Sequence, residues 1–362
     1  MDSSVGLECP VARPGARRPA LAYPARRAVH WFLALPDHLG AAITIVAAFS
    51  AIVLGIAAVY GAPLSMPRER ISAALGLHAA LPVAFAIVFY VALRAFKVLT
   101  GRQTAADPPL ARTIAVDMTL MALFITVTYF HFSLKTWVQV INPALYDEAY
   151  FAVDRQMQPL LDLFYWIRAN IFSLMPNADA LYQAAFLLMF IVGFCSLAVT
   201  RSPYYPQFSI AVLLTMSLGA LSYLPAPALG PFIYEEGLNK HATQAQAAML
   251  WAHKQAVQHG MPWIAKAGPA YFTGALSAMP SLHIAHGVAM TYFMARAGSP
   301  MTIFFLLICF WVLIESVASR WHYLIDLPVG LALAAFVICL TNRICRDKAR
   351  QAGPAPDAAA LI

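Results

Sequence analysis

The chain has 362 residues, of which 61% are hydrophobic and 11% charged, and its mean hydropathy is +0.67. Because soluble globular domains carry about 25% charged residues, this composition excludes an ordinary soluble domain and indicates an integral membrane protein. The net charge of +7 is spread over loops and tails, which favours contact with anionic lipid headgroups and gives no sign of a nucleic-acid partner.

The five cysteines show neither metal-binding nor disulfide spacing. Three of them lie in apolar stretches, and we interpret them as small hydrophobic residues. The Met and Phe residues indicate no cofactor motif either, so we expect a protein that works without a cofactor or a bound metal.

A helix needs about 20 apolar residues to span the hydrocarbon core of a bilayer. Two of the apolar stretches, those that start at 282 and 301, are short and need other helices around them. The sequence predicts an all-α integral membrane protein with about eight transmembrane helices, of which six form a catalytic bundle. The expected spans are 39–61, 73–96, 114–134, 181–200, 205–224, 282–297, 301–318 and 323–342.

Lys and Arg residues are biased toward one side of this topology. If the N-terminus is cytoplasmic, the inner loops and tails hold most of the basic residues, and the basic segment after Asn342 agrees. We therefore expect both termini in the cytoplasm. The corresponding parts of the chain are a basic tail with an interfacial segment (1–38), an N-terminal transmembrane pair (39–110), a membrane core (111–342) and a basic cytoplasmic tail (343–362).

Two long segments fall on the extracytoplasmic side. The first, 135–180, places apolar and aromatic residues at helical spacing among scattered charges. The second, 226–280, follows the end of a helix at the Pro- and Gly-rich turn 224–231 and contains a short predicted helix over 244–258. The sequence thus predicts helices that lie on the outer membrane surface.

Polar residues gather where three of the spans meet this outer surface. His283 lies in the first turn of the span near 282, and Arg320 and His322 lie between the last two spans. The topology therefore places these three side chains at one membrane surface. Ionisable residues are costly to keep there unless they act, so we interpret them as a functional site.

His322 and Asp326 are four residues apart and share a face of the last helix. Asp326 can accept a hydrogen bond from one ring nitrogen of His322, which leaves the other nitrogen as a nucleophile or base. His283 faces this pair as the opposite acid–base partner. Arg320 offers planar donors suited to phosphate oxygens, and Ser281 and nearby backbone amides add neutral donors. The pattern predicts a phosphoryl-transfer site that faces lipid substrates.

Two blocks of this sequence resemble a known family. The chain reads Pro280-Ser281-Leu282-His283 and, later, His-Tyr-Leu-Ile-Asp-Leu-Pro-Val-Gly over 322–330. These blocks are similar to P-S-x-H and H-Y-x-x-D-x-x-x-G, the second and third signatures of the type-2 phosphatidic acid phosphatase superfamily. The closer likeness is to the branch of inositol phosphorylceramide synthases and related phosphotransferases. It covers about residues 222–330.

By this resemblance, His322 is the nucleophile that forms a phosphohistidine, and Asp326 orients it. His283 protonates the leaving alkoxide and then deprotonates the acceptor. The resemblance implies metal-independent transfer of a phospho-alcohol headgroup, of the inositol-phosphate type, from a phospholipid donor to a lipid or alcohol acceptor. The alternative is a phosphatase for a lipid phosphate or pyrophosphate, in which water is the acceptor. The sequence determines neither the acceptor, nor the lipids, nor the oligomeric state.

Two features depart from the family pattern. The first block of the phosphatases, K-x6-R-P, is absent, and the turn 224–231 stands near its place. Their third block reads S-R-x5-H, whereas Arg320 is only two residues before His322. The sequence therefore does not identify the groups that hold the phosphate. Three lysines of the outer loop are further candidates: Lys240, Lys254 and Lys266.

Several further polar residues have two interpretations. His286, one turn beyond the predicted acid, either supports the site or packs. Glu315 lies inside a span and either supports the site or pairs with Arg320. Ser277 is a third supporting candidate. Asp117, near the cytoplasmic end of its span, is expected to be solvated.

Two other classes of protein fit part of this pattern. The histidines and the aspartate of the cluster form a set of metal ligands, but a fixed cation at Arg320 disfavours a metal ion and suits a phosphate. A transporter would carry its charges near mid-span on broken helices, whereas this cluster lies at the rim. We therefore expect an enzyme.

Overall fold

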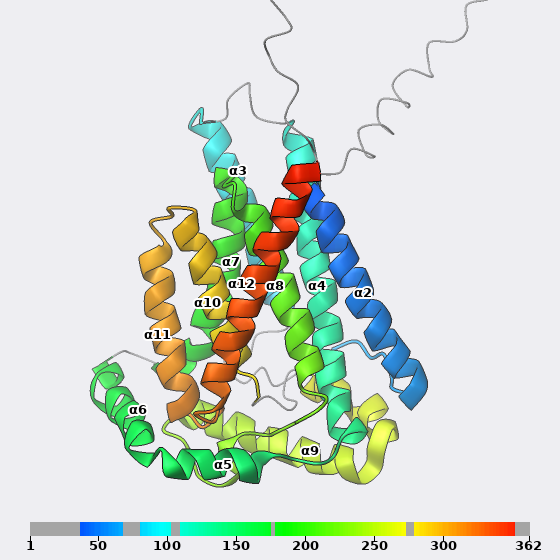
Figure 1. Cartoon of the computed structure of the whole chain (residues 1–362), viewed down its shortest axis with the longest axis vertical. Helices are drawn as coiled ribbons and strands as arrows, with labels where there is room; N and C mark the ends of the chain where they lie inside the picture. Colours follow the sequence, from blue (N-terminus) through cyan, green and yellow to red (C-terminus); the bar gives the residue numbers. More distant parts are fainter. Residues whose placement is uncertain (1–36, 68–79, 103–108, 175–177, 273–278, 352–362) are drawn as a thin grey trace, which may run out of the picture. The chain divides into compact units, whose positions relative to one another are not determined.

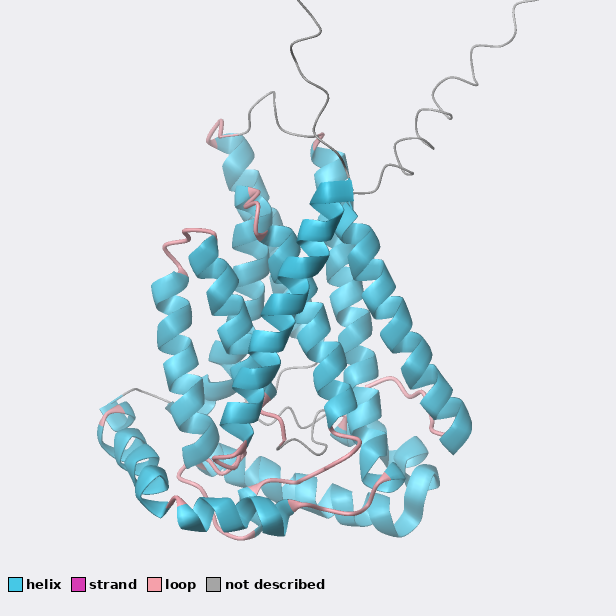
Figure 2. Cartoon of the chain, in the orientation of Figure 1, coloured by secondary structure: helices cyan, strands magenta, loops and turns pink. Residues whose placement is uncertain are grey.

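The computed structural model describes residues 37–67, 80–102, 109–174, 178–272 and 279–351. Within them the chain is helical and contains no strand, which confirms the all-α class (Figure 2). The α-helices are α2 (Asp37–Tyr60), α3 (Ala80–Leu99), α4 (Leu110–Ile141), α5 (Asp147–Gln156), α6 (Gln158–Asn170), α7 (Ala178–Thr200), α8 (Tyr205–Ser222), α9 (Lys240–Ala267), α10 (Leu282–Arg296), α11 (Thr302–Ala318) and α12 (Asp326–Gln351).

Six helices in the described part of the chain are long and apolar enough to cross a membrane. They are α2, α3, α4, α7, α8 and α12, whereas α10 and α11 have only 15 and 17 residues. All eight run in alternating directions, so that α10 and α12 begin at the end where α4 and α8 finish (Figure 1). The chain is a multi-pass helical membrane protein, and the expected total of eight passes remains a prediction.

Three helices lie across the end of the bundle where α10 and α12 begin, which we call the site end: α5, α6 and α9 (Figure 1). Helix α6 buries Leu161 and Phe164 in a cluster with Ile314 of α11. On its other face Leu163 and Trp166 are exposed. A helix that leaves an apolar face outside the protein suits the membrane interface, as the sequence predicts for this segment.

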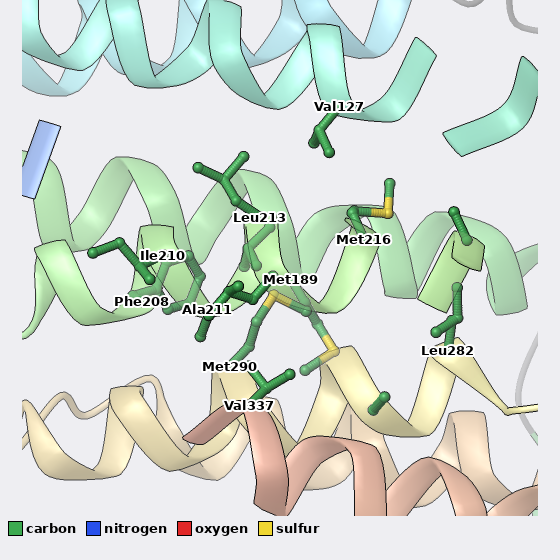
Figure 3. Packing of buried hydrophobic residues seen from close by; sticks show 14 of the residues in the cluster. Val127, Met189, Phe208, Ile210, Ala211, Leu213, Met216, Leu282, Met290 and Val337 are labelled. Carbon is green, nitrogen blue, oxygen red and sulfur yellow. The ribbon is translucent and has the colours of Figure 1, made fainter. Parts of the chain in front are cut away.

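Helix α8 is the centre of the packing. It has 72% of its apolar window buried, more than any other of the six candidate spans. Figure 3 shows Phe208, Leu213 and Met216 of α8 among apolar side chains from α4, α7, α10 and α12. Gly219 allows α10 to come close, because a Cβ there would lie 2.3 Å from Leu282 Cδ2. Such close packing holds helices together in a bilayer, where there is little water to expel.

A buried polar cluster joins α3 to α4. Arg94 Nη2 donates to Asp117 Oδ2 at 2.7 Å, and the Tyr90 hydroxyl donates to the same oxygen at 2.5 Å. Arg94 also donates to the carbonyl of Ala198 on α7 at 3.0 Å. Asp117 is buried, so the expectation of a solvated residue is wrong, because a cation from the neighbouring helix replaces water.

Candidate active site

Two helix starts meet at the site end of the bundle. The Ser281 hydroxyl caps α10 by accepting a hydrogen bond from Ile284 N at 3.5 Å, which places His283 in the first turn. Ser281 N donates to the carbonyl of Asp326 at the start of α12, at 3.3 Å. Gly330 permits this approach, because a Cβ at that position would lie 2.6 Å from Ser281 O. The backbone thus fixes the first turns of α10 and α12 against each other.

His283, His322 and Asp326 form a continuous chain of contacts. His283 Nδ1 lies 3.2 Å from His322 Nε2, and His322 Nδ1 lies 3.2 Å from Asp326 Oδ2. The same carboxylate oxygen accepts a hydrogen bond from Tyr323 N at 2.9 Å. A carboxylate at Nδ1 favours the tautomer of His322 that carries its proton there, so Nε2 keeps the lone pair. The structure therefore brings together the three side chains that the sequence analysis singled out for catalysis.

Aromatic rings of α7 pack against the imidazole of His283. The ring centroids of Tyr182 and Phe186 lie 5.1 and 4.6 Å from that of His283. His322 is 2% exposed and Asp326 is fully buried. In surroundings with so little water, charges interact more strongly than they do at an open surface.

The other predicted supporting residues lie in different places. His286 is buried, with Nδ1 3.0 Å from Leu282 O and its ring packed on Phe190 at a centroid distance of 5.2 Å. Ser277 lies outside the described residues. The three candidate lysines are all on α9 with exposed side chains: Lys240, Lys254 and Lys266.

Arg320 is fully buried and two carboxylates hold its guanidinium. Nη1 donates to Asp154 Oδ2 of α5 at 2.9 Å, and Nη2 lies 2.5 Å from Glu235 Oε1. The second oxygen of Asp154 accepts a hydrogen bond from Leu324 N at 2.8 Å. Burial raises the pKa of Asp154, and the Leu324 amide and Arg320 oppose this rise. The predicted phosphate-binding guanidinium therefore already has two anionic partners.

Asp147 holds the Pro-rich turn from the other end of α5. Its carboxylate accepts hydrogen bonds from Gly230 N at 2.9 Å and Leu229 N at 3.0 Å. The Tyr323 hydroxyl donates to it at 2.7 Å. Burial raises the pKa of Asp147, and these donors oppose the rise. The sequence analysis missed Asp147 and Asp154, although their seven-residue spacing puts both on one helix face.

Glu315 pairs with Arg168 and Asn239. Arg168 Nε donates to Glu315 Oε2 at 2.5 Å, and Asn239 Nδ2 donates to Oε1 at 2.5 Å. Arg168 also forms an ion pair with Asp179. The interpretation of Glu315 as the partner of Arg320 is therefore wrong, because a cation from α6 and the cap of α9 occupy its carboxylate.

Lys135 is a buried cation that the sequence analysis placed at the start of an outer loop. Helix α4 runs on to Ile141, so Lys135 lies within the helix and not after its end. Its Nζ lies 5.7 Å from the ring centroid of Phe132 and 5.6 Å from that of Tyr223. Tyr223 follows Gly219 of α8 by one turn, and Gly219 packs closely on Leu282, the residue before His283. The site end thus contains a cation that the hydropathy pattern assigned to the surface.

An apolar cavity of about 160 Å³ lies beside His283. Helices α7, α10, α11 and α12 line it, and its wall includes Met189, Gly287, Leu313 and Leu331. Apart from the imidazole, the lining is apolar or a thiol. Such a space suits an alkyl chain whose polar end lies at the histidine.

The structure thus combines helices that can span a membrane with a cluster of two imidazoles and a carboxylate at one end of the bundle. The chain belongs to the PAP2 superfamily, whose model matches residues 155–340. Members of this superfamily are phosphoesterases, so the protein is an enzyme of the phosphatase or phosphotransferase type. No curated protein and no solved structure matches the chain. The likeness to the superfamily is confirmed, and the branch within it remains a prediction.

Proposed function

We propose that the protein is a membrane-embedded lipid phosphotransferase. It moves a phospho-alcohol headgroup, of the inositol-phosphate type, from a phospholipid donor to a lipid or alcohol acceptor. The observation that carries this proposal is the His283–His322–Asp326 chain of contacts next to an apolar cavity. Dephosphorylation of a lipid phosphate or pyrophosphate is the second candidate, because the same groups would use water as the acceptor.

In the first half of the reaction, His322 Nε2 attacks phosphorus and the bond to the leaving alkoxide breaks. Asp326 holds the other ring nitrogen and stabilises the cationic ring that forms. His283, protonated when the anionic substrate binds, gives its proton to the alkoxide. The headgroup is then bound to His322 through a phosphorus–nitrogen bond.

In the second half, neutral His283 takes the proton of the acceptor hydroxyl. The acceptor oxygen attacks phosphorus, the phosphorus–nitrogen bond breaks, and both imidazoles return to their starting state. A lipid hydroxyl as acceptor completes a transfer, and water completes a hydrolysis. The burial of His322 and Asp326 leaves little access for water and supports the transferase.

The substrate has to part the two imidazoles. A nucleophile in near-attack geometry lies about 3–3.5 Å from phosphorus, and a proton donor needs a further hydrogen bond of about 2.7–3.2 Å to the leaving oxygen. The present separation of 3.2 Å between His283 Nδ1 and His322 Nε2 leaves no room for this group. His283 therefore rotates away from His322 when the phosphoester enters.

The lipid character of the substrate rests on the cavity and the bilayer. The cavity begins at His283 and extends along α10 and α12 toward Leu331, which is the direction an alkyl chain would take into the bilayer. Donor and acceptor reach the site laterally from the membrane. We place the site on the extracytoplasmic face with both termini in the cytoplasm, because the basic residues favour that orientation.

The test is lipid mass spectrometry after incubation of the purified protein with phosphatidylinositol and a ceramide or diacylglycerol. A new phospholipid supports the transferase. A parallel incubation with a lipid phosphate or pyrophosphate tests the second candidate, and free phosphate there, without a new phospholipid in the first incubation, supports the phosphatase. The variant His322→Ala serves as the control and should form neither product. If the wild type yields neither product, or if the variant yields as much as the wild type, the proposed function is wrong.

A further inference from the structure

Four Lys and Arg side chains are buried in the described part of the chain, and three of them have carboxylate partners. Arg94 pairs with Asp117, Arg168 with Glu315 and Asp179, and Arg320 with Asp154 and Glu235. The fourth is Lys135, which has neither an ion pair nor a hydrogen bond from its ammonium group among the described residues. A buried charge without a counter-charge is strongly unfavourable, so such a residue needs an explanation.

Aromatic rings surround Lys135 where a counter-ion would be expected. Phe132, one turn earlier on α4, and Tyr223, at the end of α8, each present a ring to the ammonium group. Ring faces attract a cation only weakly compared with a carboxylate. The rings also displace water from the ammonium group, and a poorly solvated cation attracts an anion strongly.

The position of Lys135 connects it with the catalytic histidines. The ammonium group lies against Tyr223 at the end of α8, one turn after Gly219, which packs closely on Leu282 next to His283. His131, one turn before Lys135, is fixed by a contact of 2.9 Å between its Nδ1 and the carbonyl of Met216. The last turns of α4 are thus bound to α8, and Lys135 lies at the end of the bundle where α10 and α12 begin (Figure 1).

We propose that Lys135 is the cation that binds the phosphate group of the substrate. The ligand class is a phosphoester whose anionic oxygens take the place of the missing carboxylate. An ammonium group offers three donors and a concentrated charge, which suits a tetrahedral phosphate that has to turn during transfer. This inference deepens the proposed function and rests on it for the reaction, but the binding step can be measured alone.

Two other observations favour Lys135 over the cations that the sequence analysis considered. Arg320 would have to exchange a carboxylate for the phosphate, since Asp154 and Glu235 already hold it. The candidate lysines of α9 are exposed and lie in water, where their charge is screened. Lys135 also precedes the segment 155–340 that matches the superfamily, so family membership does not assign it a role.

The experiment compares Lys135→Met with the matched control Lys254→Met, which removes the same charge from the exposed face of α9. The probe is orthophosphate, measured as a competitive inhibitor of turnover and as a ligand that raises Tm in detergent. Loss of a charge-assisted hydrogen bond should weaken orthophosphate about ten- to a hundredfold in Lys135→Met. Lys254→Met should bind it as the wild type does, and Lys135→Arg should retain part of the affinity.

The unpaired charge of Lys135 also predicts how its removal changes the stability of the protein. Without orthophosphate, Lys135→Met should fold with a Tm equal to or above that of the wild type, because an unpaired buried charge is removed. An unfolded variant, or a lower Tm together with unchanged orthophosphate affinity, would mean that Lys135 serves packing and would overturn the inference. Lys135→Gln, which keeps a hydrogen-bond donor without the charge, should behave like Lys135→Met in both measurements.

The outcome separates this inference from the proposed function. If the wild type binds orthophosphate through Lys135 but transforms no lipid, the binding site stands and the proposed reaction fails. If lipid turnover is observed and neither the KM nor orthophosphate competition depends on Lys135, the reaction stands and this inference fails.

Discussion

Substitution of one glycine should separate the start of α10, which carries His283, from the start of α12, which carries Asp326, the partner of His322. A Cβ at position 330 would lie 2.6 Å from Ser281 O and 3.4 Å from Ile284 Cβ. The neighbour at 2.6 Å is a backbone atom, which cannot swing aside as the end of a side chain can. In Gly330→Ala the starts of α10 and α12 therefore have to move apart.

The magnitude follows from these distances. Ordinary contact begins at 3.4 Å, so the required shift is about 0.8 Å, which is the difference from 2.6 Å. A misplacement of about 1 Å between reacting groups costs about 10²-fold in rate. Overpacking of this kind costs about 1–3 kcal/mol of stability, so the variant should remain folded. We expect kcat to fall by about 10²-fold with a modest decrease in Tm.

The assay measures consumption of the phospholipid on which the wild type acts, together with thermal unfolding in the same detergent. Gly55→Ala is the matched control, because a Cβ at that position of α2 meets nothing within 4 Å. It should have the activity and the Tm of the wild type. Unchanged kcat in a folded Gly330→Ala would refute the argument that the contact between Gly330 and Ser281 positions the two imidazoles.

Two further predictions concern the α5 contact and the cavity. Asp154→Asn removes one of the two anions that hold Arg320. Breaking a buried pair costs about 3–5 kcal/mol, so denaturation in detergent should show a large loss of stability. A Tm within one degree or so of the wild type would contradict the structural role of this ion pair. Cys309→Phe fills the cavity beside His283 and should lower kcat/KM for long-chain substrates by at least about tenfold, while a water-soluble short-chain phosphoester is still consumed. Cys339→Phe, on an exposed surface, is its control and should show no chain-length effect.

Hydropathy and motif spacing predicted the parts of the fold that depend on local sequence. The helices that carry His283 and Asp326 begin where the polar blocks meet apolar stretches, and their first turns lie together as the alternation of spans implies. The predicted contact between His322 and Asp326 is present, but the two residues do not share a helix face, because α12 begins at Asp326 and His322 lies in the turn before it. These features follow from short segments and need no knowledge of distant neighbours.

The contacts that the sequence analysis missed are all long-range. Asp154 meets Arg320 across 166 residues, and no periodicity within either segment reveals such a partner. The left-handed backbone conformation of Arg320, with φ of 58°, could not be predicted from the sequence either, because only the surrounding loop holds it there. The expected span ended at 134 because hydropathy treats Lys135 as a residue in water. In the structure α4 continues to Ile141, because α8 and α9 cover this part of the helix.

The contact between the two imidazoles covers the nitrogen that we propose as the nucleophile. With His283 Nδ1 only 3.2 Å from His322 Nε2, the ring of His283 fills the space that a phosphorus atom needs, so this contact has to open before His322 can attack. Opening it costs about 1 kcal/mol, equivalent to a several-fold loss of apparent affinity that every substrate bears equally. A lipid whose chain is already seated beside His283 can overcome this threshold, whereas a small phosphate that meets the site only briefly has little to hold the rings apart. The contact between the imidazoles thereby keeps His322 from reacting with small phosphates between turnovers.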